Sequence, residues 1–227
     1  MTAADRYAIP PERLARWIGR WAAEHGGVAR SVVEPAALTL TGADGATLRC
    51  EPPFPPLDAA GGAHDGPRID ELLAHVERPR TVGVLLVRLG GHAAGVFAGR
   101  ELRASKVGSR LVHGRHRAGG SSANRFRRRR ENQARDALRA AATTAERILA
   151  GPAASGELDA VVLGGDRGAL AEVLEDPRLR PVAALAVERV IEVAEPRLAV
   201  LKATPDLFLA THVLPRSAPE PGRVQEP

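Results

Sequence analysis

The segment TVGVLLVRL, residues 81–89, restricts the fold of this chain more than any other feature. It is a continuous apolar run of the kind found in buried strands. HAAGVFAGR follows after the Gly90-Gly91 turn and reads as a second short strand. ELRASKVGSRLVHG, with alternating polar residues, reads as a third. Three successive strands joined by tight turns predict a meander.

A long helix is predicted after the meander, from about Asn124 to Ala150. Its apolar residues fall on one stripe: Ala134, Leu138, Ala141, Ala142, Ala145, Ile148 and Leu149. The elements expected beyond it are a strand in LDAVVLGG, a helix in RGALAEVLED, a strand at residues 187–193, a helix in PRLAVLKAT starting at Pro196, and a last strand in DLFLATHVL. A meander followed by alternating strands and helices predicts an α/β fold, a mixed sheet covered by helices.

The first 67 residues predict a helix followed by a β-hairpin. Leu14, Trp17, Ile18 and Trp21 recur at helical spacing, and Gly26-Gly27 end the pattern. ALTLTGADGATLRCEP alternates around an Asp44-Gly45 turn, a strong hairpin signal. Residues 52–67 are expected to form a loop, residues 69–76 a short helix, and the Pro-rich tail from Pro215 a disordered segment.

Composition excludes several classes of protein. The hydrophobic content of 44% is ample for a buried core, and the single cysteine, Cys50, rules out an internal disulfide and a cysteine-built zinc site. The amino terminus lacks a signal-peptide pattern, and no apolar run approaches the roughly 20 residues that span a bilayer. The expected location is the cytoplasm.

Positive charge is concentrated in one part of the chain. Between residues 102 and 130 there is no aspartate or glutamate, while ten arginines and lysines lie in that window. The whole chain carries a formal charge of +5, so the rest of the chain sums to −5. A single basic patch on an otherwise acidic protein is typical of a nucleic-acid binder.

The stretch RHRAGGSSAN, between the third strand and the long helix, predicts an exposed loop. Gly119 and Gly120 leave the backbone open to close approach, and Ser122 or Asn124 can cap the helix, whose free N–H groups then face an anion. The arginines at the start of the helix, Arg125 and Arg127 to Arg130, point in all directions and oppose the helix dipole. Phosphates would neutralise them; the alternative is a solvated helix face.

The basic loop and its flanks resemble a known family. VHGRHRAGGSSANRFRRRRENQ, with GVLLVRLGGHAAGVFAGRELRASKVGSR before it and LDAVVLGGDRGALAEVLEDPRL after it, is similar to the actinobacterial branch of the Vms-like release factors. These resemble in turn the middle, catalytic domain of eukaryotic and archaeal class I translation termination factors. The resemblance extends from the amino-terminal helix to about Leu214.

The resemblance implies an RNase H-like mixed sheet with a loop that enters the ribosomal peptidyl-transferase centre. There the loop would promote hydrolysis of the peptide–tRNA ester on stalled or split large subunits, without a metal or other cofactor. The implied partners are large-subunit rRNA and peptidyl-tRNA, and the chain is expected to be a monomer. The implied division is an amino-terminal extension (1–67), a release-factor-like catalytic domain (68–214) and a tail (215–227).

The resemblance also assigns roles to residues. Those expected to act in catalysis are Gly119, Gly120, Ser122 and Asn124. Those expected to bind RNA are Arg110, His113, Arg115, His116, Arg117, Arg125, Arg127, Arg128, Arg129 and Arg130.

At one place the chain departs from the family. Related proteins have a glutamine within a few residues of the Gly-Gly pair, often in GGxSQQRF, whereas this chain reads GGSSANRF. Asn124 retains an amide on a side chain one methylene shorter, and a water-positioning group displaced by about 1 Å can lose around a hundredfold in rate. A rival hypothesis is therefore a ribosome- or RNA-binding protein of the same fold that has lost hydrolysis, which Ala123 favours.

The other motifs that could form a site are expected to have structural roles or to be incomplete. LGGDRGAL predicts a tight strand-to-helix turn with Asp166 as helix cap, because the Walker lysine and full GxGxxG spacing are missing. His113 and His116 lack further ligands for a metal, His92 and His212 are expected to be turn or sheet residues, and Trp17 and Trp21 core residues. A two-metal nuclease would need converging carboxylates, and only Glu101, Asp159 and Asp166 are available.

Overall fold

The computed structural model describes residues 5–88, 90–109 and 123–218, and within this range the side chains of residues 123–130 are not described. The chain forms two compact units, Met1–Arg78 with Asp206–Pro227, and Pro79–Pro205. None of the described helices is both long and apolar enough to cross a lipid bilayer.

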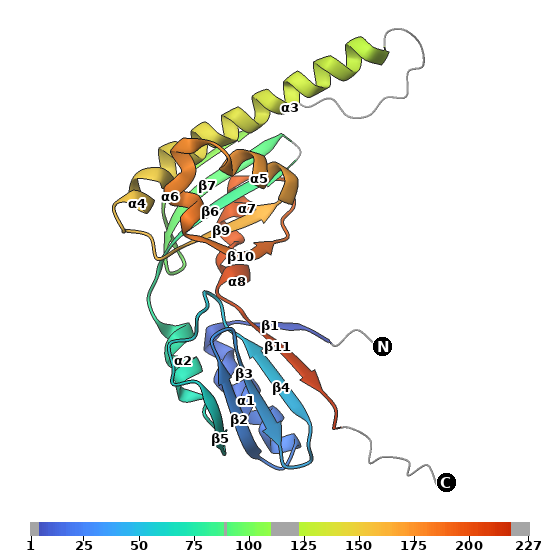
Figure 1. The fold of residues 1–227 in the computed structure, drawn as a ribbon, viewed down its shortest axis with the longest axis vertical. Helices are drawn as coiled ribbons and strands as arrows, with labels where there is room; N and C mark the ends of the chain where they lie inside the picture. Colours follow the sequence, from blue (N-terminus) through green and yellow to red (C-terminus); the bar gives the residue numbers. More distant parts are fainter. Residues whose placement is uncertain (1–4, 89, 110–122, 219–227) are drawn as a thin grey trace. The chain divides into compact units, whose positions relative to one another are not determined.

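The first unit contains an antiparallel sheet of six strands in the order β1-β11-β4-β3-β2-β5 (Figure 1). The strands are β1 (Tyr7–Ile9), β2 (Val28–Glu34), β3 (Ala37–Gly42), β4 (Thr47–Glu51), β5 (Gly62–Asp65) and β11 (Thr211–Arg216). The helices are α1 (Pro11–Glu24), α2 (Asp70–Glu77) and α8 (Pro205–Phe208), the last beginning at the boundary between the units. Apolar residues of α1, α2 and the sheet form its core, among them Leu14, Leu38, Leu48 and Leu72.

The sequence predicted the helices α1 and α2 and the β3–β4 hairpin of this unit. The hairpin turn contains Gly45 at φ 87°, and the amide of Ala46 donates to the Asp44 carboxylate at 2.9 Å. Trp21 is buried as expected, while Trp17 is half-buried at the edge of the core. Strands β1, β2 and β5 were not predicted, and β5 lies within the segment expected to be a loop.

The second unit contains a mixed sheet of five strands in the order β10-β9-β6-β7-β8. Its central strand β6 pairs antiparallel with β7 and parallel with β9, β7 pairs antiparallel with β8, and β9 pairs parallel with β10. The strands are β6 (Thr81–Arg88), β7 (Gly91–Ala98), β8 (Glu101–Ser109), β9 (Ala160–Gly165) and β10 (Ala186–Ile191). The predicted meander and mixed α/β sheet are confirmed, and residues 82–87 of β6 are all buried.

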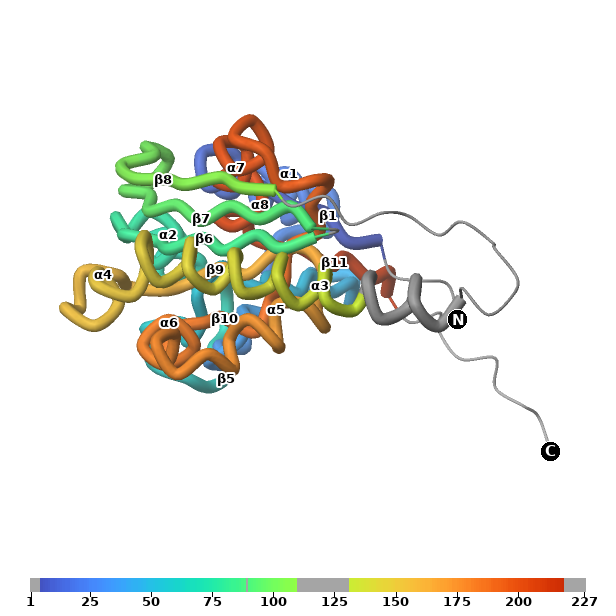
Figure 2. Tube along the Cα trace, turned by 90° about the horizontal axis from the view of Figure 1, so that it is seen from above, coloured from blue at the N-terminus to red at the C-terminus, as the bar shows by residue number. Residues whose placement is uncertain are grey.

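Helices cover both faces of this sheet. They are α3 (Ala123–Ala145), a π-helical turn η1 (Glu146–Ala150), α4 (Gly151–Ala154), α5 (Arg167–Leu174), a 3-10 turn η2 (Pro177–Leu179), α6 (Arg180–Ala184) and α7 (Leu198–Ala203). Residues of α3, α5 and α6 pack on the face that carries Leu85 and Ala94. Leu201 of α7 packs near Gly95, on the opposite face. The long helix predicted from about residue 124 to 150 is confirmed, and Figure 2 shows it running along the direction of the strands.

The carboxyl-terminal elements differ from the prediction. The segment DLFLATHVL, expected to be the last strand of the mixed sheet, contains the end of α8 and most of β11, which pairs with β1 and β4 in the first unit. Its alternation of buried and half-buried residues predicts a strand, but local alternation cannot indicate which sheet the strand joins. Pro215 and Arg216, expected in the tail, end β11.

The division of the chain into residues 1–67, 68–214 and 215–227 stays a prediction. The compact units of the structure differ from that division in grouping α2 and β11 with the amino-terminal residues. This grouping brings together strands from the two ends of the chain.

Candidate nucleic-acid interface

The basic segment, residues 102–130, begins in strand β8 and ends in helix α3. Ser109, the last residue of β8, pairs with Gly91 at the start of β7. Arg88, at the carboxyl end of β6, pairs with the same glycine. The basic segment therefore leaves the sheet at the edge where the parallel strands β6 and β9 end.

Helix α3 is anchored over the sheet by small side chains. Ala137, Ala141, Ala142 and Ala145 are buried, and Leu149 in the following π-helical turn is fully buried. Alanines allow the helix backbone to approach the sheet closely, and the contact buries a continuous apolar stripe. The carboxyl-terminal half of α3 is thus held against the core of the second unit.

The amino-terminal half of α3 is different. Glu131, Asn132 and residues 134–136 are exposed, and Gln133 is only half-buried. In Figure 1 these turns continue past the edge of the sheet. The helix therefore extends from the body of the second unit, and its first residues carry the arginine-rich part of the sequence.

A buried polar contact joins α3 to the strands that lead to the basic segment. His92 of β7 is buried, and its Nε2 atom forms a hydrogen bond with Oγ1 of Thr144 at 3.0 Å. The same ring covers Gly108 near the end of β8, where an added Cβ would lie 2.5 Å from Nε2. Only glycine fits there without a shift of the ring, so this contact links the position of α3 to that of β8. His92 is a sheet residue, as expected.

The LGGDRGAL turn has the structural role that the sequence predicted. The Asp166 carboxylate accepts a hydrogen bond from the amide of Ala169 at 2.8 Å and so caps α5. Gly165 has φ 106°, and a Cβ there would lie 2.2 Å from the carbonyl oxygen of Val87. Glycine is required by the close approach of the two strand ends.

The three carboxylates considered for a nuclease do not lie together. Asp159 accepts a hydrogen bond from the amide of Thr81 at the start of β6, and Glu101, at the start of β8, pairs with Arg103 at 2.9 Å. Asp166 follows β9, and its amide donates to the carbonyl oxygen of Val87 near the other end of β6. Thr81 and Val87 are six residues apart along the strand, which at about 3.3 Å per residue separates the two ends by roughly 20 Å. Among the described residues no three His, Cys, Asp or Glu side chains form a group that could hold a metal ion.

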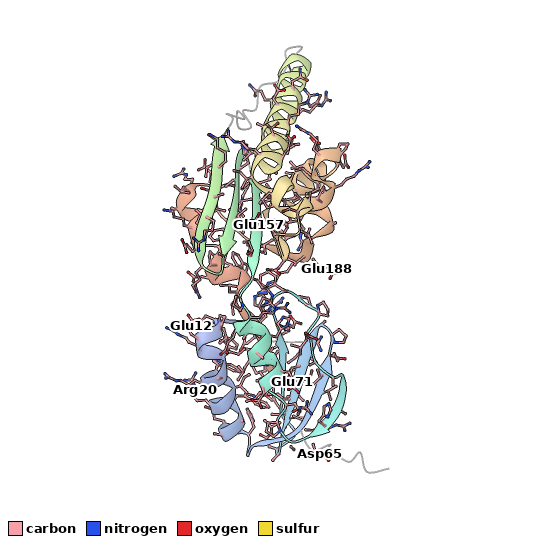
Figure 3. The ribbon with its side chains drawn as sticks, turned by 90° about the vertical axis from the view of Figure 1, so that its left-hand side faces the viewer. Glu12, Arg20, Asp65, Glu71, Glu157 and Glu188 are labelled. Carbon is pink, nitrogen blue, oxygen red and sulfur yellow. The ribbon has the colours of Figure 1, made fainter. Side chains whose placement is uncertain are left out.

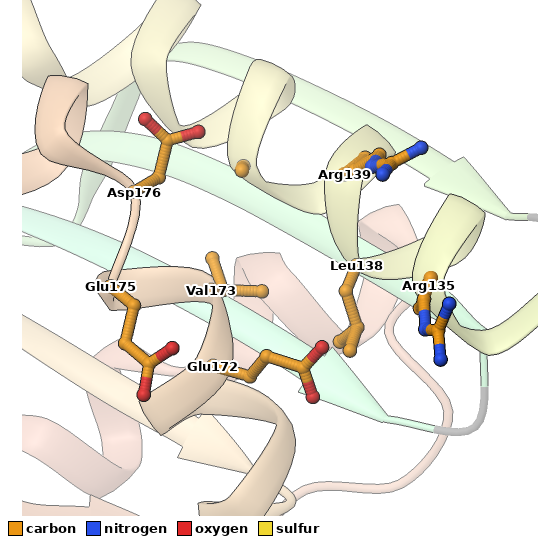
Figure 4. Close-up of a pocket in the computed structure, with 8 residues that line it drawn as sticks. Arg135, Leu138, Arg139, Glu172, Val173, Glu175 and Asp176 are labelled. Carbon is orange, nitrogen blue, oxygen red and sulfur yellow. The ribbon is translucent and has the colours of Figure 1, made fainter. Parts of the chain in front are cut away.

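A groove lies between α3 and α5, with a volume of about 300 Å³ (Figure 4). Its two sides carry opposite charge: Arg135 and Arg139 on α3, and Glu172, Glu175 and Asp176 at the other side, over the apolar residues Leu138, Ala142 and Val173. No sequence motif predicted this groove. Its only sequence signal is the pair of arginines four residues apart that flank Leu138.

Asp176 is held by an ion-pair network at the far end of the groove. Its carboxylate pairs with Arg178 at 2.6 Å, and Arg178 also contacts Glu146 in the turn after α3. The Arg178 side chain, and then the Arg178 backbone amide, lower the pKa of Asp176 to about 2. The network connects the end of α3 to the segment after α5.

The predicted site residues fall in two groups. Those that lie outside the described residues are Arg110, His113, Arg115, His116, Arg117, Gly119, Gly120 and Ser122. Those within α3 whose side chains are not described are Asn124, Arg125, Arg127, Arg128, Arg129 and Arg130. Their roles in catalysis and RNA binding therefore stay predictions.

The start of α3 refines two expectations from the sequence. Because the helix begins at Ala123, Asn124 lies within its first turn, and Ser122 is the residue that immediately precedes it. Arg125 is in the first turn, but Arg127 to Arg130 follow it. The helix dipole acts mainly within the first turn, so its cost applies to Arg125 more than to the other four.

Comparison with known proteins identifies the family. Residues 80–214 match the family model described as Actinobacteria/chloroflexi VLRF1 release factor. No curated protein matches the chain. Among solved structures, an archaeal translation termination factor, aRF1, is similar with a TM-score of 0.44 and 17% identity, over 88% of this chain and 73% of that one.

Pelota from Archaeoglobus fulgidus is similar with a TM-score of 0.29 and 13% identity, over 91% of this chain and 64% of that one. Family membership rests on the sequence match, which spans more than half of the 227 residues and includes the whole basic segment, rather than on these distant structural likenesses. The chain belongs to the Actinobacteria/chloroflexi VLRF1 family of translation release factors.

Proposed function

We propose that this protein is a ribosome-associated peptidyl-tRNA hydrolase that cleaves the peptide–tRNA ester on stalled large ribosomal subunits. The proposal rests on the family match over residues 80–214. The matched range includes the basic segment with its Gly-Gly pair, strand β8 and helix α3. The proposed partners are large-subunit rRNA and peptidyl-tRNA. The protein would act in the cytoplasm as a monomer.

The geometry of α3 supports the RNA-binding part of the proposal. One half of the helix is fixed to the sheet by Leu149 and the His92–Thr144 contact, while the other half is exposed. A helix held to the sheet at its carboxyl-terminal end can bring the basic segment into a narrow, polyanionic cavity while the rest of the second unit stays folded. Contacts of Arg115, Arg117, Arg125 and Arg127 to Arg130 with phosphates would then supply salt-dependent affinity.

The proposed chemistry uses water as the nucleophile. Gly119 and Gly120 let the backbone approach the ester, and the side-chain amide of Asn124 orients a water molecule toward the ester carbonyl carbon. Water adds to this carbon, the bond to the tRNA ribose oxygen breaks, and the products are a free peptide acid and a tRNA with its hydroxyl restored. Ser122, the residue immediately before α3, would cap the helix.

One sequence feature favours a second candidate function. Ala123 occupies a position where related proteins carry glutamine, and it is the first residue of α3. Without the glutamine amide, the protein would bind the large subunit through the same surface and release no peptide. This candidate is a non-catalytic ribosome-binding protein of the same fold.

A release assay separates the two candidates. Purified protein is incubated with stalled large subunits that carry labelled peptidyl-tRNA, and free peptide is measured against time. The hydrolase predicts release by the natural chain and a loss of at least about a hundredfold on Asn124→Ala, with subunit binding unchanged. Binding without release, together with release gained on Ala123→Gln, would establish the non-catalytic candidate instead.

A further inference from the structure

The outer face of α1, in the first unit, carries a row of exposed arginines. Arg13, Arg16 and Arg20 are separated by three and four residues, so they lie along one side of the helix, while Leu14 and Ile18 are buried on another. Figure 3 shows Arg20 directed away from the sheet of this unit. At about 1.5 Å per residue the row spans roughly 10 Å.

These three arginines differ from others in the same unit. Arg6 pairs with Glu51 at 2.8 Å, Arg49 pairs with Glu34 at 2.9 Å, and Arg68 pairs with Glu71. Within the part of the chain that the structure describes, the arginines of α1 form no ion pair. The only carboxylates on α1 are Glu12 and Glu24, near its two ends. Arg30 of β2 and Arg216 of β11 are also exposed and form no ion pair among the described residues, but they lie on separate strands. The three arginines of α1 lie together on one helix face.

Two aromatic rings lie beside this row. Trp17, four residues after Arg13 and three before Arg20, is half-buried, and its ring centroid is 6.3 Å from that of Tyr7 on β1. Tyr7 is the only tyrosine of the chain and is 45% exposed, and its hydroxyl donates to the Asp5 carboxylate at 3.3 Å. An exposed aromatic ring close to unpaired guanidinium groups is typical of surfaces that bind unpaired nucleotides.

We infer that Arg13, Arg16 and Arg20, with Tyr7 and Trp17, form a second RNA-binding surface that takes a short unpaired stretch of RNA. The guanidinium groups contact successive phosphates, and Tyr7, supported by Trp17, stacks on a base. This surface lies outside residues 80–214, which match the release-factor family. The inference does not depend on peptidyl-tRNA hydrolysis, and it gives the first unit a ligand of its own.

The test uses the full-length chain with Arg127 to Arg130 changed to glutamine, so that RNA binding by the basic segment is reduced. The probe is a fluorescein-labelled single-stranded oligouridine of twelve nucleotides, and its affinity is measured by anisotropy at several salt concentrations. In this background, Arg13→Gln/Arg16→Gln/Arg20→Gln is expected to weaken binding at least about tenfold. It should also reduce the magnitude of the log–log salt slope by roughly 2, at about 0.7 for each contact.

The matched control removes three other exposed arginines, Arg147, Arg167 and Arg180, which belong to the second unit and form no ion pair among the described residues. This control is expected to change the slope little. Equal effects of the two triple variants would show that only net charge matters and would overturn the inference. Tighter binding of the background protein to phosphatidylserine vesicles than to the RNA would also overturn it, because the face would then suit a membrane.

Tyrosine variants test the stacking part. Tyr7→Ala is expected to weaken oligouridine binding by about 5- to 100-fold, while Tyr7→Phe, which keeps the ring and removes the hydroxyl, should bind like the background protein. Equal losses in both variants would assign the effect to the contact with Asp5 and would contradict stacking. Unchanged thermal unfolding midpoints verify that each variant is folded.

Discussion

The two halves of helix α3 lie in opposite environments. Toward its carboxyl end, Ala141, Ala145 and the following Leu149 are buried against the sheet, and Thr144 meets the ring of His92. Toward its amino end, Glu131 and Asn132 are exposed and the neighbouring sequence is rich in arginine. The comparison indicates that one half stabilises the fold and the other half is available to a ligand. Substitutions should therefore separate stability from RNA binding along a single helix.

The largest effect is expected at the anchored end. Leu149→Ala should lower the free energy of unfolding by about 2–5 kcal/mol, because the side chain is fully buried and its removal leaves a cavity. Urea unfolding measures the change. Leu198→Ala is the control, since that leucine is 44% exposed, and it should cost less than about 1 kcal/mol. Equal costs would mean that α3 is not anchored through this residue.

The next effect concerns the contact between α3 and β7. Thr144→Val keeps the shape of the side chain but removes the hydroxyl that bonds to His92, which should cost about 1–3 kcal/mol of unfolding free energy. The adjacent Thr143 is exposed, so Thr143→Val should change the same quantity by less than about 0.5 kcal/mol. A Thr144→Val protein as stable as the Thr143→Val protein would contradict a stabilising role for the contact.

At the other half of the helix, the expected change in stability is smaller and has the opposite sign. Changing Arg127 to Arg130 to glutamine removes like charges three residues apart and should raise the free energy of unfolding by a few tenths of a kcal/mol at low salt. The gain should vanish in 1 M salt, because screening removes the repulsion. The same variant should bind large subunits more weakly. Marked destabilisation would instead mean that these arginines pack against the protein.

The smallest effect is expected from Asp176 and depends on pH. Arg178 lowers the pKa of this half-buried carboxyl from 3.8 to about 2, so its contribution to stability is present above pH 3.8 and is lost as the pH falls toward 2. Asp176→Asn should flatten the dependence of the unfolding midpoint on pH in this window. Glu175→Gln, whose carboxylate is in no ion pair of the described structure, is the control. An unchanged slope in Asp176→Asn would show that the pair contributes nothing.

Much of the second unit could be predicted from the sequence, because its signals are local. The apolar run of β6, the stripe of α3 and the capping aspartate Asp166 each define an element within a few residues, and the structure confirms the three elements. One residue predicted on the stripe, Ala134, is instead exposed, because α3 has left the sheet at that turn. The first unit was harder to predict. Its strand β11 comes from the other end of the chain, and β5 is a short, mostly exposed strand without an apolar alternation.

The candidate site divides in the same way. The charge pattern and Gly-Gly pair identified the basic segment, and the family match includes it. The contact of His92 with Thr144 and Gly108 could not have been predicted, because it joins residues far apart in the sequence across two strands and a helix. The pairing of Tyr7 with Trp17 depends in the same way on how β1 packs beside α1.

The proposed entry of the basic segment into the peptidyl-transferase centre is tested most directly by tethered hydroxyl-radical probing. Cys50, the only cysteine, is fully buried, and burial raises the pKa of its thiol to about 12, so an iron chelate will attach selectively to a cysteine introduced at the surface. Iron at Ser121→Cys should cleave rRNA around the peptidyl-transferase centre. Iron at Ala154→Cys, an exposed position beyond the anchored end of α3, should not. Cleavage there from both positions, or from neither, in particles that retain the protein would contradict the account.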